Sequence, residues 1–242
     1  MAVESTTTAP KPNGLKTAID IIIAPKDALA AIAAGPTWGW AFLIAVAMFV
    51  IGTLMLGPAI QHAMTASWPT MVASNPSLAQ QSPEQQQRAL AIALTFTKFS
   101  WIFAPIGLAL IMLISTVFMV IFNAIGRGQG SFKLFWAASV NIAIVSGLQP
   151  VASGIIAMAR GADSFTTMQS PQTAVPSLAL LAPAAGVKLA TLLGAFTPFS
   201  LWAGGLVVAT MVIVARVPRV HAWLTGILTL LVPALIASAF AR

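Results

Sequence analysis

Few residues of this chain have the type and spacing that a chemical site requires. The glycine-rich run Gly126–Gly130 (GRGQG) is superficially similar to a phosphate-binding loop, but it lacks the Lys-Ser/Thr pair and follows an apolar stretch rather than a strand. We interpret it as a flexible turn between two helices. His62 and His221 have no Cys or acidic residue at metal-ligand spacing, and His221 is expected to contact lipid headgroups beside Arg219.

Methionines and amides offer two further possibilities. Methionine pairs seven residues apart could form a thioether path for copper, but methionine also fills gaps in apolar packing, and we interpret the pairs that way. The pairs are Met48 and Met55, Met64 and Met71, and Met112 and Met119. Asn123, Asn141 and Gln149 fall within or near apolar runs, where an unpaired amide is costly, so each is expected to bond to a neighbouring helix.

Acidic residues are absent from every predicted membrane span, and the chain shows no Ser-His or paired-carboxylate arrangement. Proton-coupled transport and intramembrane acid-base catalysis usually rely on an acidic group inside a span. We therefore predict no catalytic, cofactor-binding or metal-binding residues, no cofactor and no enzymatic activity. The five acidic residues are Glu4, Asp20, Asp27, Glu84 and Asp163.

The elements that carry these residues are membrane helices. With 58% hydrophobic and 7% charged residues, the chain has too little polar surface to cover a water-soluble fold of 242 residues. Continuous apolar runs select helices over a barrel, so we predict an all-α integral membrane protein. Cysteine is absent, which excludes disulfides and thiolate metal sites. The net charge of +7 comes from scattered residues without a basic stripe, so lipid headgroups are the expected partner and nucleic acid is not.

Five transmembrane helices are expected, because each lies in a run of uncharged sequence long enough to cross the membrane. The fourth run is residues 189–215, of which 199–215 is the expected span, and the part before it is expected to lie against the membrane. Tryptophans lie near the N-terminal end of each span, as in interfacial aromatic belts. The spans are residues 38–56, 99–124, 134–159, 199–215 and 221–240.

Three regions follow along the chain. Residues 1–14 are polar and expected to be a disordered tail, without the pattern of a cleavable signal peptide. Residues 15–37 form two short helices separated at Pro25. The stripe Leu15, Ala18, Ile19, Ile22 and Ile23 predicts an amphipathic helix that lies in the membrane interface. Residues 38–242 form the five-helix membrane domain.

Helices are also expected in the two long connections. Ser82-Pro83-Glu84-Gln85 has the pattern of a capping box and predicts a helix running toward Lys98. Residues 177–196 predict an interfacial helix with a break at Pro183. Small residues at four-residue spacing predict close helix packing. They are Ser139, Ala143 and Gly147 in the third span and Gly205 and Ala209 in the fourth.

The distribution of Lys and Arg favours a cytoplasmic N-terminus and a periplasmic C-terminus in a bacterial inner membrane. With that orientation seven basic residues lie inside and five outside, and the inner set occupies short segments, where the positive-inside rule acts most strongly. The inner set is Lys11, Lys16, Lys26, Arg127, Lys133, Arg216 and Arg219, and the outer set is Arg88, Lys98, Arg160, Lys188 and Arg242.

Several segments taken in order resemble the bacterial branch of the Yip family, the Ypt/Rab-interacting membrane proteins. They are Pro25-Lys26-Asp27, Gly35-Pro36, the turn ending Gly130-Ser131-Phe132-Lys133, Gln149-Pro150, and Thr197-Pro198-Phe199-Ser200-Leu201-Trp202. The resemblance implies a five-helix membrane domain with a cytoplasmic N-terminus. It does not imply recruitment of a GTPase, because the chain has no tyrosine and so lacks the Asp-Leu-Tyr-Gly-Pro motif of eukaryotic members.

These observations predict a non-enzymatic scaffold or adaptor that organises proteins or lipids at the inner membrane. Its expected partners are membrane lipids and a membrane-protein partner or a second copy of the chain. The alternative is a subunit of a small-solute transporter or channel, since broken helices and buried amides can line a path. Flux that is lost on Asn141→Leu would favour the alternative.

Overall fold

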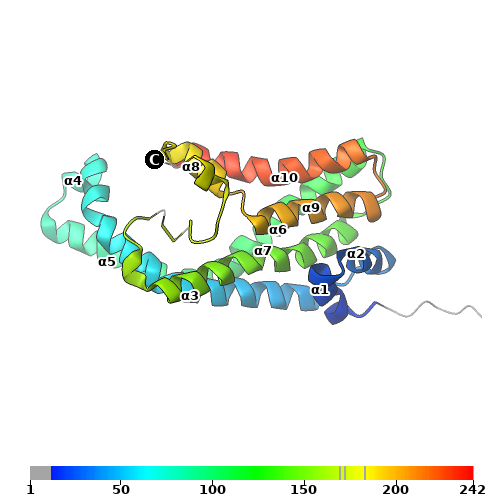
Figure 1. Cartoon of the computed structure of the whole chain (residues 1–242), viewed down its shortest axis with the longest axis horizontal. Helices are drawn as coiled ribbons and strands as arrows, with labels where there is room; N and C mark the ends of the chain where they lie inside the picture. The colour runs from blue at the N-terminus through cyan, green and yellow to red at the C-terminus, as the bar shows by residue number, and fades with distance from the viewer. Residues whose placement is uncertain (1–11, 169, 172, 183, 242) are drawn as a thin grey trace, which may run out of the picture.

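Helices account for all the regular secondary structure in the described part of the chain. The computed structural model describes residues 12–168, 170–171, 173–182 and 184–241. Figure 1 shows how the α-helices of these residues are arranged. In chain order they are α1 (Gly14–Ile23), α2 (Pro25–Ala34), α3 (Gly39–Ser74), α4 (Pro76–Ala79), α5 (Pro83–Phe99), α6 (Ala104–Ile125), α7 (Phe132–Arg160), α8 (Val187–Gly194), α9 (Pro198–Ile213) and α10 (Arg219–Phe240).

Four helices, α3, α6, α7 and α10, are long and apolar enough to cross a membrane. A fifth crossing is available if α8 and α9, which meet at a bend of 56°, count as one broken span. The predicted all-α membrane fold is therefore confirmed. The fourth predicted span differs from the others, because its straight part, α9, is only 16 residues or about 24 Å long.

Successive long helices run in opposite directions, and the two turns at one end of the bundle are joined (Figure 1). The main-chain N–H of Gln129, between α6 and α7, donates to the carbonyl of Ala215, between α9 and α10, at 2.7 Å. At the same end Trp38, before α3, and Trp136, the fifth residue of α7, make an edge-to-face contact with ring centroids 6.3 Å apart. The C-terminal end of α10 lies at the opposite end of the bundle (Figure 1).

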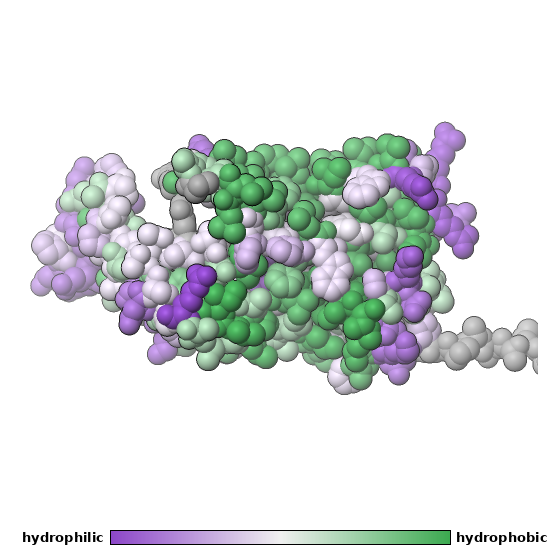
Figure 2. Space-filling model, viewed as in Figure 1, coloured by the Kyte–Doolittle hydropathy of each residue, from purple (hydrophilic) through white to green (hydrophobic). Residues whose placement is uncertain are grey.

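Hydrophobic side chains cover the length of the bundle on the face shown in Figure 2, and hydrophilic residues gather beyond its two ends. Exposed large apolar residues such as Ile106, Leu110 and Ile227 lie on the outer faces of α6 and α10. An outer surface of this kind is stable in hydrocarbon and not in water. The chain is a multi-pass membrane protein.

The most extensive helix contact is between α3 and α7, and glycine makes it possible. A Cβ added at Gly52 would lie 2.5 Å from the main-chain carbon of Pro150, and one at Gly154 would lie 2.5 Å from Met55 Cβ. Gly147 faces Met48, so the predicted small-residue face of α7 does pack against a helix. Methionine therefore fills the space beside glycine here, as the packing interpretation expects.

In α9 the predicted small-residue face was wrong. Gly205 is exposed, and a Cβ there would meet nothing within 4 Å. The glycine at the contact is Gly204, which faces Leu230 of α10, while Gly226 of α10 faces Val208. The spacing of small residues indicated that another helix could pack closely against α9. Which side of α9 faces that helix depends on the packing with α10.

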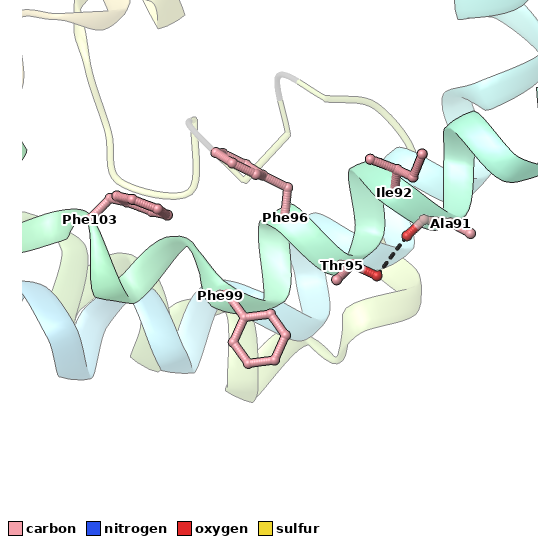
Figure 3. A pocket seen from close by; sticks show the side chains of 6 residues that line it. All are labelled: Ala91, Ile92, Thr95, Phe96, Phe99 and Phe103. Atoms are coloured by element: carbon pink, nitrogen blue, oxygen red, sulfur yellow. Dashed lines mark hydrogen bonds between the residues drawn. The ribbon is translucent and has the colours of Figure 1, made fainter.

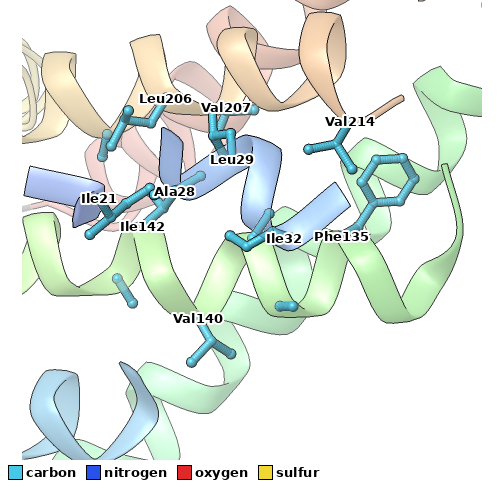
Figure 4. Close-up of a cluster of buried hydrophobic side chains, with 14 of the residues drawn as sticks. Ile21, Ala28, Leu29, Ile32, Phe135, Val140, Ile142, Leu206, Val207 and Val214 are labelled. Carbon is cyan, nitrogen blue, oxygen red and sulfur yellow. The ribbon is translucent and has the colours of Figure 1, made fainter. Parts of the chain in front are cut away.

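Helices α1 and α2 are part of the bundle. Ile21, Leu29 and Ile32 are fully buried, and Figure 4 shows them between α7 and α9, close to Ile142 and Leu206. Leu15, Ile19 and Ile23 of the predicted amphipathic stripe remain exposed, as a lipid-facing stripe would be, but Ala18 is buried and Ile22 packs against the core. The opposite side of α1 faces protein, because Thr17 is 2% and Asp20 is 9% exposed.

Most predicted boundaries agree with the helices within a few residues. Asn13 caps α1, which begins at Gly14, while residues 1–11 of the predicted tail lie outside the described residues. Ser82 and Gln85 form the predicted capping box of α5. The first predicted span was too short, because α3 continues through Pro58 and Pro69 to Ser74. The predicted helix at 177–196 consists of a short 3-10 turn, Leu178–Leu181, and α8, with Pro183 outside the described residues.

Candidate functional site

A cavity of about 660 Å³ lies in the half of the bundle away from the basic turns, as its lining residues show. Its walls come from α3, α6, α7, α8, α10, the segment between α7 and α8, and Ser200 in the first turn of α9. It exists because α9 is short: α9 begins at Pro198, level with Gln149 of α7, and the preceding helix α8 turns away to pack against α10. The part of α7 beyond Gln149 thus has no α9 beside it.

One polar wall of the cavity is a face of α7, and Thr191 of α8 and Ser200 of α9 are further polar residues in its lining. Ser146, Gln149 and Ser153 all line it, at the i, i+3 and i+7 spacing that places side chains on the same side of a helix. Gln149 Oε1 accepts a hydrogen bond of 2.8 Å from Thr197 Oγ1. Thr197 is fully buried and caps α9 together with Ser200, whose hydroxyl accepts from Thr197 N–H at 2.8 Å.

The remaining donors on this face are unused within the described residues. The Gln149 amide NH₂ and the hydroxyls of Ser146 and Ser153 donate to no described residue. Helical hydroxyls elsewhere commonly donate to the carbonyl four residues back, as Thr53 does to Phe49 at 2.7 Å and as Thr210 does to Leu206 at 2.8 Å. Ser153 is only 6% exposed, so its unused hydroxyl is costly unless the cavity supplies a partner.

The described lining contains no Asp, Glu, Lys, Arg or His. Its other walls are mainly apolar, with Phe49 and Leu56 from α3 and Ile111 from α6. Such a cavity can hold an apolar molecule that carries an uncharged hydrogen-bond acceptor.

A second concave surface lies on α5 (Figure 3). It is an apolar groove of about 440 Å³, which we call the α5 groove, and Phe96 and Phe103 stack in it with ring centroids 5.7 Å apart. No residue of α5 is buried, and Ile92 is 70% and Phe96 65% exposed. The groove is lined by Ala91, Ile92, Thr95, Phe96, Phe99 and Phe103.

Of the three amides singled out in the sequence, the structure places only Gln149 at the cavity. Gln149 bonds to the residue that caps a neighbouring helix, as expected. Asn141 donates to Thr37 O, before α3, at 2.9 Å and to Ala137 O at 2.8 Å. Asn123 does not bond to a neighbouring helix; that prediction was wrong. Its amide exchanges two hydrogen bonds with the main chain of Gly130 and closes the turn between α6 and α7.

Sequence reasoning missed one partner of a histidine. His62 Nδ1 lies 3.0 Å from the carbonyl oxygen of Phe165, and His62 Nε2 lies 3.4 Å from Asp163. The sequence separation of about 100 residues left no local signal for this contact. His221 has a buried Nδ1 without a hydrogen-bond partner in the described part of the chain.

No charged side chain lines either concave surface in the described residues. Lys16 and Asp20 pair on α1, and the hydrogen bond and charge of Asp20 raise the pKa of Lys16 above its ordinary value of 10.5. In the described residues no group of three His, Asp or Glu side chains is placed to hold a metal ion. Arg127 and Arg216, in the two joined turns, both have positive φ, at 51° and 55°.

Comparison with known proteins adds no relative. The chain matches no protein-family model, no curated protein and no solved structure.

Proposed function

We propose that this multi-pass membrane protein is a non-enzymatic scaffold or adaptor of a bacterial inner membrane. In this proposal the α5 groove is the docking surface for a membrane-protein partner. The observation that carries it is the exposure of α5: this 17-residue helix has no buried residue, and its Phe96 stacks on Phe103, the N-cap of α6. Aromatic residues in a concave apolar patch are typical of interaction sites.

The position of the groove supports a partner in the same membrane. Phe103 ends the groove, and the exposed residues Ile106 and Leu110 of α6 follow it one and two helical turns later. A partner helix beside α6 could therefore extend directly onto α5. Helix α3, about 54 Å long, exceeds the roughly 30 Å hydrocarbon layer and supports α5 along its outer part.

Placement of the basic residues supports the proposed orientation, with the N-terminus cytoplasmic and the C-terminus periplasmic. Arg127 and Lys133 flank one of the joined turns, and Arg216 and Arg219 belong to the other, so all four lie at one end of the bundle. Anionic lipids of a cytoplasmic leaflet attract such a group.

Membership of the Yip family remains our proposal, and the positions of the resembling segments support it. Gln149-Pro150 and the segment beginning at Thr197 are 48 residues apart and share a hydrogen bond. Pro25 begins α2, and Ser131 caps α7. The segments therefore occupy positions where helices begin or are tied together.

In-cell photocrosslinking tests the scaffold role. A photoreactive phenylalanine analogue at Phe96 should give a discrete protein adduct, whereas the same analogue at Ile236, an exposed position of α10, should give none. Adducts to lipid alone at Phe96, or equal protein adducts at both positions, would contradict the proposed docking surface. Deletion of α1 and α2 is not a clean test, since Ile21 and Leu29 belong to the core.

The cavity favours a second candidate, a subunit of a small-solute transporter or channel. Its unused donors could contact a passing solute, and α9 begins within the bundle as the broken helices of transporters do. Asn141 does not line the cavity, whereas Ser153 does, so Ser153→Ala is the variant that tests transport. Solute flux in proteoliposomes that is lost in this variant would favour transport over the scaffold role.

A further inference from the structure

The cavity beside α7 has the position and chemistry of a lipid site, whether or not the α5 groove contacts a partner. Three donor groups face it from Ser146, Gln149 and Ser153, and none of them donates to a described residue. Ser153 is more than nine-tenths buried as a residue, and it lines the cavity, so a partner for its hydroxyl has to come from the cavity. The cavity therefore calls for an occupant that accepts hydrogen bonds.

The uncharged lining of the cavity and its apolar walls indicate what kind of molecule it holds. The described lining has no cationic side chain, which disfavours a carboxylate or a phosphate as the group held there. The apolar walls from Phe49, Leu56 and Ile111 require an apolar remainder. Ile111 is 60% exposed and thus also belongs to the outer surface of the bundle, so the cavity borders the space where acyl chains lie.

The depth of Gln149 and Ser153 in the membrane also indicates which uncharged acceptor they bind. From Phe132, the first residue of α7, the helix rises about 26 Å to Gln149 and about 32 Å to Ser153. The hydrocarbon layer is roughly 30 Å thick, so an α7 near the membrane normal places these donors at its far boundary. Ester groups of membrane glycerolipids lie at this boundary, between acyl chains and headgroups.

We propose that the cavity binds a glycerolipid of the leaflet opposite the basic turns. One of its ester carbonyls accepts hydrogen bonds from Ser153 and the Gln149 amide, and the other accepts from Ser146. The acyl chain of the lipid lies along Phe49, Leu56 and Ile111. The N-terminus of α9, with Ser200 at the cavity wall, adds a favourable dipole for the carbonyl oxygen. A bound lipid then fills the volume that the short α9 leaves beside α7.

A pair of lipids that differ only in their linkage tests the proposal. The purified full-length protein in detergent is incubated with equal amounts of dioleoyl phosphatidylcholine and its diether analogue, and the retained lipids are compared by native mass spectrometry. The diether lacks the carbonyl oxygens but keeps the chains and headgroup. We expect a preference for the diester of about fivefold for each hydrogen bond made.

Variants of the cavity show whether its serine donors cause the preference for the diester lipid. Ser146→Ala combined with Ser153→Ala removes two donors without touching the bond between Gln149 and Thr197, and should abolish most of the preference. Ser139→Ala, on the same helix but in contact with Thr116, should leave it intact. Equal retention of the two lipids by the unaltered protein would overturn the proposal, and so would an undiminished preference in the double variant.

Discussion

Thr197 donates a hydrogen bond of 2.8 Å to Gln149, and this bond sets the depth at which α9 begins beside α7. Thr197 is fully buried and is also the N-cap of α9. Because capping and the inter-helix bond use the same side chain, the start of α9 is tied to one position on α7. The cavity lies directly beyond that position, so this pair of residues determines where it forms.

Replacing Gln149 should destabilise the start of α9. In Gln149→Leu the buried hydroxyl of Thr197 loses its acceptor, which we expect to cost about 1–3 kcal/mol of unfolding free energy. Thermal unfolding in detergent measures the change. Ser146→Ala, on the same face but without a hydrogen bond to a described residue, should change stability by less than about 0.5 kcal/mol. Similar losses in the two variants would contradict this role of Gln149.

A methyl group at Gly52 should force α3 and α7 apart. The added Cβ would meet main-chain atoms of Pro150 and Val151 at 2.5 and 2.7 Å, and a main chain cannot give way as a side chain can. We expect Gly52→Ala to lower the unfolding free energy by about 1–3 kcal/mol.

Gly205 provides the control for Gly52, since it lies inside the apolar helix α9, does not precede a proline, and a Cβ there would meet nothing within 4 Å. Gly205→Ala should be neutral or stabilising by up to about 1 kcal/mol, because alanine favours the helix. Equal effects at the two glycines would show that α3 and α7 are not packed this closely.

The left-handed backbone at Arg127 should favour glycine. A non-glycine residue with φ of 51° carries a steric cost of about 1–2 kcal/mol, so Arg127→Gly should raise the unfolding free energy by up to about this amount. Arg127→Ala removes the same charge but keeps the Cβ and should give no such gain. If the two variants unfold at the same temperature, strain at Arg127 is not the cause of any change.

His62 should restrain the segment that follows α7. Its Nδ1 must donate to the carbonyl of Phe165, since a carbonyl only accepts, so Nε2 pairs with Asp163 only when the ring is protonated. His62→Ala should increase tryptic cleavage after Arg160, measured by limited proteolysis in detergent. Thr65→Ala, one turn along α3, removes a hydroxyl that bonds only to Gln61 and should leave cleavage unchanged. Equal cleavage after Arg160 in the two variants would contradict the proposed restraint.

Local sequence signals predicted the start of a helix well where the residues that form the signal also form the stabilising contacts. The Ser82–Gln85 capping box and the Thr197-Pro198 helix start both depend on side chains within four residues, and both are present. The helix α3 shows the limit of such signals. Pro58 and Pro69 favoured an earlier end, yet the helix continues past both because contacts with α7 and α5 support it.

Function-related contacts were harder to predict, because they join residues that are far apart in the sequence. Gln149 was expected to bond to a neighbouring helix, but nothing in the sequence indicated that Thr197 would be the partner. The same separation concealed the contact of His62 with Asp163, about 100 residues away. For Asn123 the reverse holds, since a partner seven residues away, Gly130, satisfied its amide locally.

The sequence by itself determined that the chain is a helical membrane protein, because apolar runs of this length can be stable only in hydrocarbon and only as helices. Tertiary structure alone decided which faces of those helices meet and where they leave space. A run of apolar residues is stable against lipid or against another helix, so hydropathy does not distinguish Gly204 at a contact from Gly205 at the surface. The cavity beside Ser153 likewise arises only when the short α9 is placed against α7.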